Sequence, residues 1–282
     1  MTRLRLKLYL PLLLFVFAAA TCAPAQVAEP GVGGVLKPII NNYPYTVQQD
    51  EAILKLFTDA RVSDVVDALD TVGLPDITIM TPDIQTLWRD TKEFSHRIQG
   101  VAITARYVKS SRVVPRVPQA DYNNWAGAWY KTITPDAWTQ QIRPGMIAVL
   151  DKAEDGDTRN IGSNNFMGWK LKGLRGVVTS GGAGDTDEII AEKLPIYMKR
   201  LERGYPPGRS EIESVNLPVM VGNVLVRPGD IIVADGDGVA VVPRQHAEAV
   251  ATWARKILDG DKVGRRKLYE KLGIPLDKSV LP

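Results

Sequence analysis

The sequence is poor in the side chains that build disulfides and soft metal sites. It has one cysteine, Cys22, and two histidines, His96 and His246, among 282 residues. Cys22 lies in an N-terminal segment that we expect to be removed, so the mature chain has no disulfide, thiol nucleophile or thiolate ligand. The two histidines lack metal-ligand spacing. A chain of about 255 residues with ordinary apolar content must then be held by its hydrophobic core.

Several function classes are excluded because their signatures are missing. There is no P-loop, no dinucleotide-binding fingerprint and no G-x-S-x-G elbow at Ser163 or Ser180. No stretch interleaves aromatic and basic residues as a nucleic-acid groove does, so no nucleic-acid partner is expected. The formal charge of +3 falls to about zero without the N-terminal segment, because that segment carries three cations and no acid.

The first 25 residues have the layout of a secretory signal peptide. Three cations within residues 3–7 precede the apolar run Leu8–Ala20, and the small-x-small triplet Ala23-Pro24-Ala25 follows. We expect cleavage near Ala25 and a periplasmic or secreted protein with no stable membrane insertion. The alternatives are an uncleaved anchor and a lipoprotein acylated at Cys22.

The first half of the mature chain divides by composition. Residues 26–48 predict an extended N-terminal arm, residues 50–69 one or two amphipathic helices, with a local cap at Ser63 and Asp67, and residues 98–107 a strand. Residues 109–141 form a Trp-rich insertion. We predict an irregular loop that its aromatic side chains fasten to the domain surface. A lid or an oligomer contact is the alternative.

The second half alternates strands with helices. We predict one α/β domain over residues 49–260 and a C-terminal tail over residues 261–282. The expected strands are 146–150, 176–179, 219–226, 231–234 and 239–242, and the expected helices are 166–171, 186–194 and 245–258.

The clearest chemical signal is the glycine-rich loop Ser180–Asp185 between a predicted buried strand and a helix. Glycines allow backbone N–H groups to approach a ligand, and a helix N-terminus favours an anion. Asp185 at the mouth of this loop can hold a divalent cation, because Mg²⁺ usually takes one or two protein carboxylates and keeps waters. The alternative role for Asp185 is a helix cap, paired with Glu188 in a capping box.

Four stretches resemble the family that contains 4-hydroxy-4-methyl-2-oxoglutarate aldolase and the regulator of ribonuclease activity A. They cover most of residues 60–244, and the last is the most specific. These stretches are Val62–Leu69, Gly100–Arg106, Arg175–Asp185 and Leu217–Pro243.

The resemblance implies a single three-layer β/β/α domain of the swivelling-domain type, with the N-terminal arm and C-terminal helices added. It implies homotrimers or hexamers with sites between subunits, and a Mg²⁺ or Mn²⁺ ion. Aldolases of the family cleave 4-hydroxy-2-oxo diacids to pyruvate and decarboxylate oxaloacetate. The metal-holding aspartate of the family falls on Asp185, and its substrate-binding turn falls on Gly162–Asn165.

Two positions depart from the family pattern. Gly184 stands where the family has a substrate-binding arginine, and Ser163 stands where it has an acid. We therefore expect Asn164 or Asn165 to act as catalytic residues in place of the lost groups. The predicted substrate-binding residues are Gly162, Ser163, Asn164, Asn165, Gly182 and Gly184.

Two functions follow as hypotheses. The first is an exported metal-dependent lyase that acts on a small oxo- or hydroxy-carboxylate. The second is a non-catalytic binding or assembly protein that has kept the fold.

Overall fold

The computed structural model describes residues 37–153 and 156–281. The predicted signal peptide and residues 26–36 of the predicted arm lie outside the described residues. Among the helices within these ranges, none has both the length and the apolar content needed to cross a membrane.

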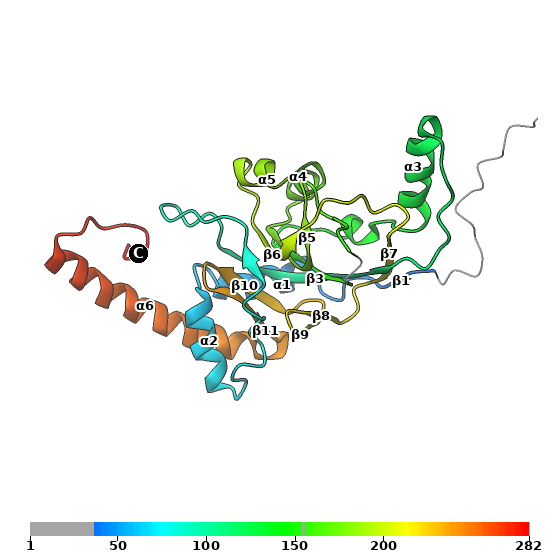
Figure 1. The fold of residues 1–282 in the computed structure, drawn as a ribbon. Helices are drawn as coiled ribbons and strands as arrows, with labels where there is room; N and C mark the ends of the chain where they lie inside the picture. The colour runs from blue at the N-terminus through cyan, green and yellow to red at the C-terminus, as the bar shows by residue number, and fades with distance from the viewer. Residues whose placement is uncertain (1–36, 154–155, 282) are drawn as a thin grey trace, which may run out of the picture.

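A central mixed sheet carries the fold, in the strand order β1-β7-β3-β4-β5-β6-β2 (Figure 1). Neighbouring strands β3, β4, β5 and β6 are parallel, so their carboxyl ends meet at one edge, where ligands of open α/β sheets bind. Antiparallel β10 and β11 extend the sheet from β3. The bounds are β1 Ile39–Ile40, β2 Gln85–Thr86, β3 Ile98–Lys109, β4 Met146–Lys152, β5 Gly176–Ala183, β6 Ile196–Leu201, β7 Ser210–Val215, β10 Ile231–Asp235 and β11 Gly238–Val242.

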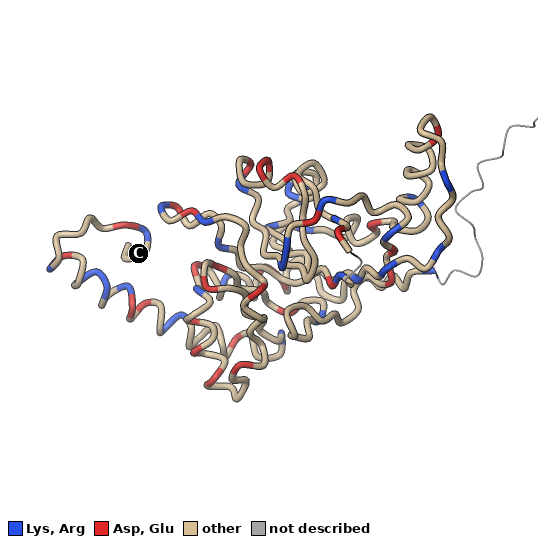
Figure 2. The backbone as a smooth tube through the Cα atoms, in the orientation of Figure 1, with Lys and Arg blue, Asp and Glu red and all other residues tan. Residues whose placement is uncertain are grey.

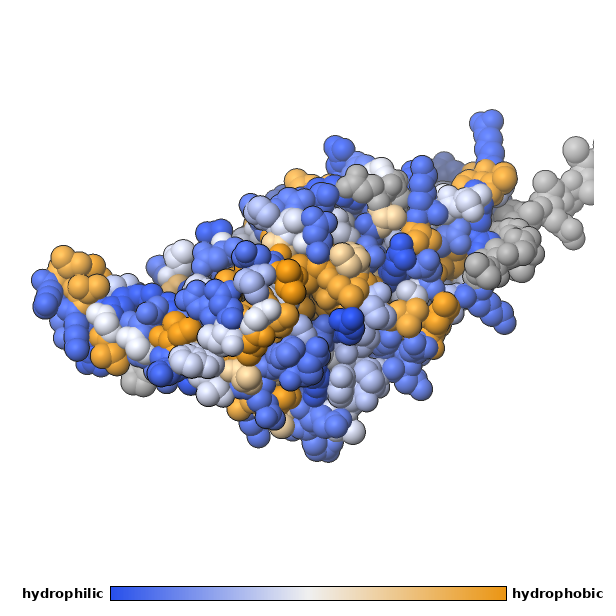
Figure 3. Space-filling model, turned by 90° about the horizontal axis from the view of Figure 1, so that it is seen from below, coloured by the Kyte–Doolittle hydropathy of each residue, from blue (hydrophilic) through white to orange (hydrophobic). Residues whose placement is uncertain are grey.

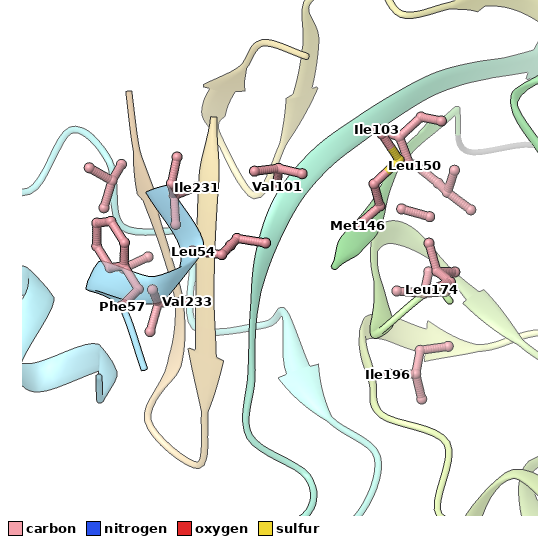
Figure 4. Packing of buried hydrophobic residues seen from close by; sticks show 14 of the residues in the cluster. Leu54, Phe57, Val101, Ile103, Met146, Leu150, Leu174, Ile196, Ile231 and Val233 are labelled. Carbon is pink, nitrogen blue, oxygen red and sulfur yellow. The ribbon is translucent and has the colours of Figure 1, made fainter. Parts of the chain in front are cut away.

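The two faces of the sheet bury different partners. Helices cover one face: α1 Val47–Leu56, α2 Val62–Thr71, α4 Ser163–Leu171, α5 Thr186–Ala191 and α6 Ala247–Leu272. In Figure 4, Leu54 and Phe57 lie beside Val233 at one end of this core, while Met146 and Leu174 lie at the other. The hairpin β8 Val219–Val221 with β9 Val224–Val226 packs on the other face. The predicted α/β fold with its sheet and helical layers is confirmed.

Several predicted boundaries were wrong. The arm ends at Thr46, which caps α1 in a capping box with Gln49. The local cap at Ser63 and Asp67 does not form, because Asp64 accepts the Arg61 N–H at the start of α2. The strand predicted over 219–226 is a hairpin that turns at Gly222 and Asn223, both at positive φ. Strands β6 and β7 were not predicted.

Helix α6 is longer than predicted and replaces most of the expected tail. It runs for 26 residues to Leu272 and ends at Gly273, whose φ of 67° gives the left-handed C-cap. Its buried residues end at Leu258, and charged side chains follow one another along the outer half (Figure 2). Elsewhere the surface exposes scattered apolar side chains, such as Met220 and Leu225; the underside of the molecule shows apolar groups among hydrophilic ones (Figure 3).

The Trp-rich insertion is ordered around a helix, so its predicted irregular structure is only partly correct. Helix α3, Tyr122–Thr132, buries Trp125 and Trp129, and the Trp129 indole N–H donates to the Ser210 carbonyl at 3.0 Å. Trp138 is fully buried, and its indole N–H donates to the Tyr107 hydroxyl at 2.8 Å. These indoles fasten the insertion to the sheet.

Candidate functional site

A pocket of about 400 Å³ lies where the start of α4, the β5–α5 junction and the Trp-rich insertion meet. It combines carboxylates, a guanidinium, amides and tyrosines. The lining residues are Tyr107, Tyr130, Thr134, Asp136, Thr139, Arg159, Asn160, Ile161, Gly162, Asn164, Asn165, Trp169, Asp185, Tyr205 and Pro206.

Asp185 occupies the turn between β5 and α5 in a left-handed conformation, with φ of 53°. Asp tolerates this region better than most residues, and such strain clusters at functional sites. Its side chain makes no capping bond to α5, so the predicted capping box with Glu188 is wrong. Instead its Oδ2 accepts the Ser163 backbone N–H at 3.3 Å. A Cβ at Gly162 would lie 2.6 Å from that oxygen, so a side chain there would displace the Asp185 carboxylate.

The N-terminus of α4 faces into the same pocket. Gly162 is the N-cap, and the first helical bond runs from the Phe166 N–H to the Gly162 carbonyl. The N–H groups of Asn164 and Asn165 therefore have no acceptor inside the helix, and both residues are exposed and line the pocket. Uncapped N–H groups with the positive end of a helix dipole bind anions.

The other predicted site residues have different roles. Strand β5 continues to Ala183, so most of the predicted loop is strand, with a register shift between Thr179 and Gly182. The Gly182 N–H bonds to Glu202 at 3.0 Å, and the Gly184 N–H bonds to the Ile161 carbonyl at 3.0 Å. The prediction that these two N–H groups bind substrate is therefore wrong. Ser163 is buried and orients Asp185 through its N–H.

The glycines of β5 make room for a buried ion cluster. Glu202 is almost fully buried and pairs with Lys152 at 3.1 Å and Arg200 at 2.8 Å. A Cβ at Gly181 would meet the Lys152 side chain, and one at Gly182 would overlap the Arg200 carbonyl. Packing against this ion cluster leaves little room for a side chain at either glycine.

Gly182→Ala is expected to destabilise the protein by about 3 kcal/mol, because the methyl group meets backbone that cannot move aside cheaply. Gly168→Ala is the matched control: it lies in α4 with nothing near its Cβ, and it should be neutral or stabilising by up to about 1 kcal/mol. Urea unfolding measures both variants, and equal midpoints for the two would contradict this assignment.

Arg159 occupies the space that a side chain at position 184 would fill. A Cβ at Gly184 would overlap the Arg159 Cδ, so the two residues are sterically complementary. The backbone N–H of Arg159 donates to the Gly204 carbonyl at 2.9 Å, and the Arg159 guanidinium donates to the Arg203 carbonyl. This arginine, which no sequence motif singles out, brings a cation to the pocket that Asp185 also lines.

Two further polar side chains in the pocket lack protein partners. Both amide atoms of Asn160 and the Thr134 hydroxyl are buried and make no hydrogen bond to any described residue. Buried polar groups are nearly always bonded, so these atoms are unsatisfied polar positions in the wall of the pocket. The open N-terminus of α4 is the feature of this pocket that favours an anion.

A model of the RraA-like family, described as Aldolase/RraA, matches residues 62–241. The chain belongs to the RraA-like family. One relative, a protein of Halalkalibacterium halodurans named putative 4-hydroxy-4-methyl-2-oxoglutarate aldolase, is 33% identical over 136 residues; the alignment covers 47% of this chain and 62% of that protein's length. An uncharacterised protein of Methanocaldococcus jannaschii is 32% identical over 155 residues, which cover 54% of this chain and 67% of that protein.

Solved structures agree on the RraA-like fold. An uncharacterised protein from Pseudomonas syringae pv. tomato superimposes with a TM-score of 0.58 at 22% identity, covering 79% of this chain and 91% of that chain. A Streptomyces coelicolor protein, described as an unusual member of the RNase ES inhibitor RraA protein family, gives 0.60 at 20% identity, covering 79% and 99%. The family includes aldolase-like members and ribonuclease inhibitors.

One carboxylate of the pocket, that of Asp185, lies at the β5–α5 turn where the sequence predicted a metal ligand. Within residues 37–153 and 156–281, no group of three or more His, Cys, Asp or Glu side chains is arranged to hold a metal. Asp185 is therefore the candidate ligand for a divalent cation, and the rest of the coordination would have to come from outside these side chains. Such sparse coordination by protein is usual for Mg²⁺.

The insertion contributes to the pocket as well. Tyr130, Thr134 and Asp136 line it from α3 and the segment that follows, so the segment 109–141 borders the site. The pKa of the Asp136 carboxyl is raised to about 6 by burial, against the lowering effect of a hydrogen bond from Tyr107. No motif surrounds Asp136 in the sequence, which is why it was missed.

Proposed function

We propose that this RraA-like protein is a divalent-metal-dependent carbon–carbon lyase that releases pyruvate from a small oxo- or hydroxy-carboxylate. The observation that carries the proposal is the pairing of Asp185 with the N-terminus of α4. One carboxylate that can hold a cation and two free N–H groups that can hold an anion line the same pocket. A 2-oxo acid that chelates a metal ion requires both a bound cation and donors for its carboxylate.

The proposal assigns roles to the polar groups around Asp185. The N–H groups of Asn164 and Asn165 bind the carboxylate next to the 2-oxo group. Arg159 binds the distal carboxylate, since a guanidinium pairs with carboxylates in fixed geometry. A bound Mg²⁺ or Mn²⁺ supplies Lewis-acid stabilisation of the negative charge that develops on the 2-oxo oxygen. Ser163 orients Asp185 through its backbone N–H.

The direct test uses purified protein with Mn²⁺, oxaloacetate and 4-hydroxy-4-methyl-2-oxoglutarate, with pyruvate release as the readout. The proposal expects release that stops when EDTA is added and resumes with excess Mn²⁺. No release across a panel of oxo acids, with no Mn²⁺ bound in calorimetry, would support the non-catalytic binding protein instead.

Export and assembly are parts of the same proposal. Cleavage near Ala25 would deliver the protein to the periplasm or the medium, and a homotrimer or hexamer is the proposed assembly. N-terminal sequencing of protein from the native host tests the first, and a chain that still begins at Met1 would refute it. Light scattering of the purified protein tests the second, and a monomer would refute it.

Arg159→Ala is expected to raise KM for oxaloacetate about 10- to 100-fold, because a hydrogen bond to a charged group contributes about 1.5–3 kcal/mol. Arg203→Ala is the matched control: its side chain is 87% exposed, pairs with Asp157 and does not line the pocket. Steady-state kinetics should show less than a twofold change for that control. Equal KM values for both variants would show that Arg159 does not bind the substrate.

A further inference from the structure

We propose that Asp136 is the catalytic acid–base residue of this pocket, and that it carries the proton of a 4-hydroxy-2-oxo acid during cleavage. The proposal rests on the proposed function, which it extends from a metal and carboxylate site to a complete aldol-type site. It also assigns a role to the Trp-rich insertion, which brings the carboxyl to the pocket.

The position of Asp136 is fixed by a chain of hydrogen bonds that starts in the core. The Trp138 indole N–H donates to the Tyr107 hydroxyl at 2.8 Å, and that hydroxyl donates to Asp136 Oδ1 at 2.6 Å. Tyr107 and Trp138 are buried, and Trp138 packs against Trp169 with ring centroids 4.8 Å apart. One carboxylate oxygen is thereby anchored, and Asp136 lines the pocket together with Asp185 and Arg159.

The surroundings of Asp136 suit a group that gains and loses a proton near neutral pH. Tyr107 on β3 and Tyr130 on α3 are the titratable groups near it, and burial raises the pKa of both tyrosines, so they stay neutral. The charged side chains of the pocket are Arg159 and Asp185. Burial raises the pKa of Asp136 to about 6, close to the value at which a carboxyl is an efficient acid–base catalyst.

The proposed step balances in atoms and electrons. The carboxylate of Asp136 takes the proton of the C4 hydroxyl, and the electron pair left on that oxygen forms the C4 carbonyl of the leaving oxo product. The C3–C4 bond breaks, and its electron pair becomes the C2–C3 double bond of the pyruvate enolate. Asp136 then returns the same proton to C3, which gives pyruvate. No oxidant, reductant or further reactant is consumed.

The experiment compares Asp136→Asn with the wild-type protein, using Mn²⁺ and two substrates. Cleavage of 4-hydroxy-4-methyl-2-oxoglutarate should fall about 10²- to 10⁴-fold, the usual contribution of a general acid–base group. Oxaloacetate has no hydroxyl proton to remove, so its decarboxylation should fall at least tenfold less. The rise of kcat/KM with pH near 6 for the hydroxy acid should disappear. A variant that keeps both the cleavage rate and this pH dependence would overturn the proposal.

Tyr107→Phe provides a second readout that a purely structural role would not give. The Tyr107 hydroxyl lowers the pKa of Asp136 by donating to it, so its removal should shift the rise of kcat/KM to higher pH. An unchanged midpoint would contradict the assignment. If wild-type protein releases no pyruvate from either substrate, the proposed function itself fails. If wild-type protein is active and the Asp136 and Tyr107 variants match it, the lyase function stands and this inference fails.

The raised pKa also predicts a change in stability that needs no activity. An unfolded aspartate has a pKa of about 3.9, so between about pH 4 and 6 the folded state binds more protons, and wild-type stability falls as pH rises through this window. Asp136→Asn has no ionisable carboxyl at this position, so its stability should not fall over this pH range for this reason. Its urea midpoint should exceed the wild-type value at pH 8 and match it at pH 4, and a difference of the same size at both pH values would contradict the shifted pKa.

Discussion

Asp185→Asn is expected to reduce metal-dependent pyruvate release about a thousandfold or more. The substitution removes the carboxylate that we propose holds the cation beside the N-terminus of α4, and with it several kcal/mol of stabilisation of the developing negative charge. Asparagine adopts the left-handed conformation as readily as aspartate, so the turn at φ of 53° is preserved. Mn²⁺ affinity by calorimetry should fall together with activity.

Asp187→Asn is the matched control for this prediction. Asp187 is exposed in the first turn of α5, two residues from Asp185, and it does not line the pocket. Its activity and Mn²⁺ affinity should stay within about twofold of wild type, because surface substitutions away from a site change free energies by about 0.5 kcal/mol or less. Activity that survives in Asp185→Asn at equal Mn²⁺ would place the metal elsewhere.

Trp138→Ala is expected to lower the free energy of unfolding by about 3–5 kcal/mol, the usual cost of truncating a fully buried tryptophan. The indole fills the space between β3 and α4, where it contacts the Trp169 ring, and it donates to the Tyr107 hydroxyl. Its loss also leaves that hydroxyl without its donor, which should loosen Asp136. Urea unfolding measures the stability change, and substrate cleavage measures the effect on the pocket.

Trp253→Ala tests whether this cost depends on burial. Trp253 lies in α6 with 44% of its surface exposed and a Lys256 ammonium over its ring. Its loss should cost about 1 kcal/mol or less, since an exposed cation–π contact contributes about 0.5–1 kcal/mol. Similar losses for the two tryptophan variants would show that the insertion is not fastened to the sheet through Trp138.

The sequence predicted what is encoded locally. Asp185 lies where a helix begins after a strand, and that pattern can be recognised in a few residues, whereas Gly162–Asn165 was found only through the family resemblance. The largely apolar strands β3, β4 and β10 were recognised for the same reason. What local pattern did not reveal was how the groups are used: Asp185 looked like a cap for its own helix, yet its carboxylate bonds to the start of α4.

The missed residues depend on contacts between distant parts of the chain. Arg159 lies over Gly184 because Thr158 pairs with Gly204 and the Arg159 N–H bonds to the Gly204 carbonyl. Asp136 is held by Tyr107, 29 residues earlier in the chain. Strand β6 carries Lys199 and Arg200, and strand β7 carries Glu211 and Glu213, so their pairing partners define them more than their own composition does.

The central claim is that Asp185 and the N-terminus of α4 bind a divalent cation and a chelating carboxylate together. A crystal structure of the protein with Mn²⁺ and oxalate, which mimics the pyruvate enolate, tests it most directly. We predict an anomalous Mn²⁺ peak at the Asp185 carboxylate, with oxalate oxygens on the N–H groups of Asn164 and Asn165. A pocket without Mn²⁺ at saturating concentration, or a Mn²⁺ peak on other residues, would contradict the account.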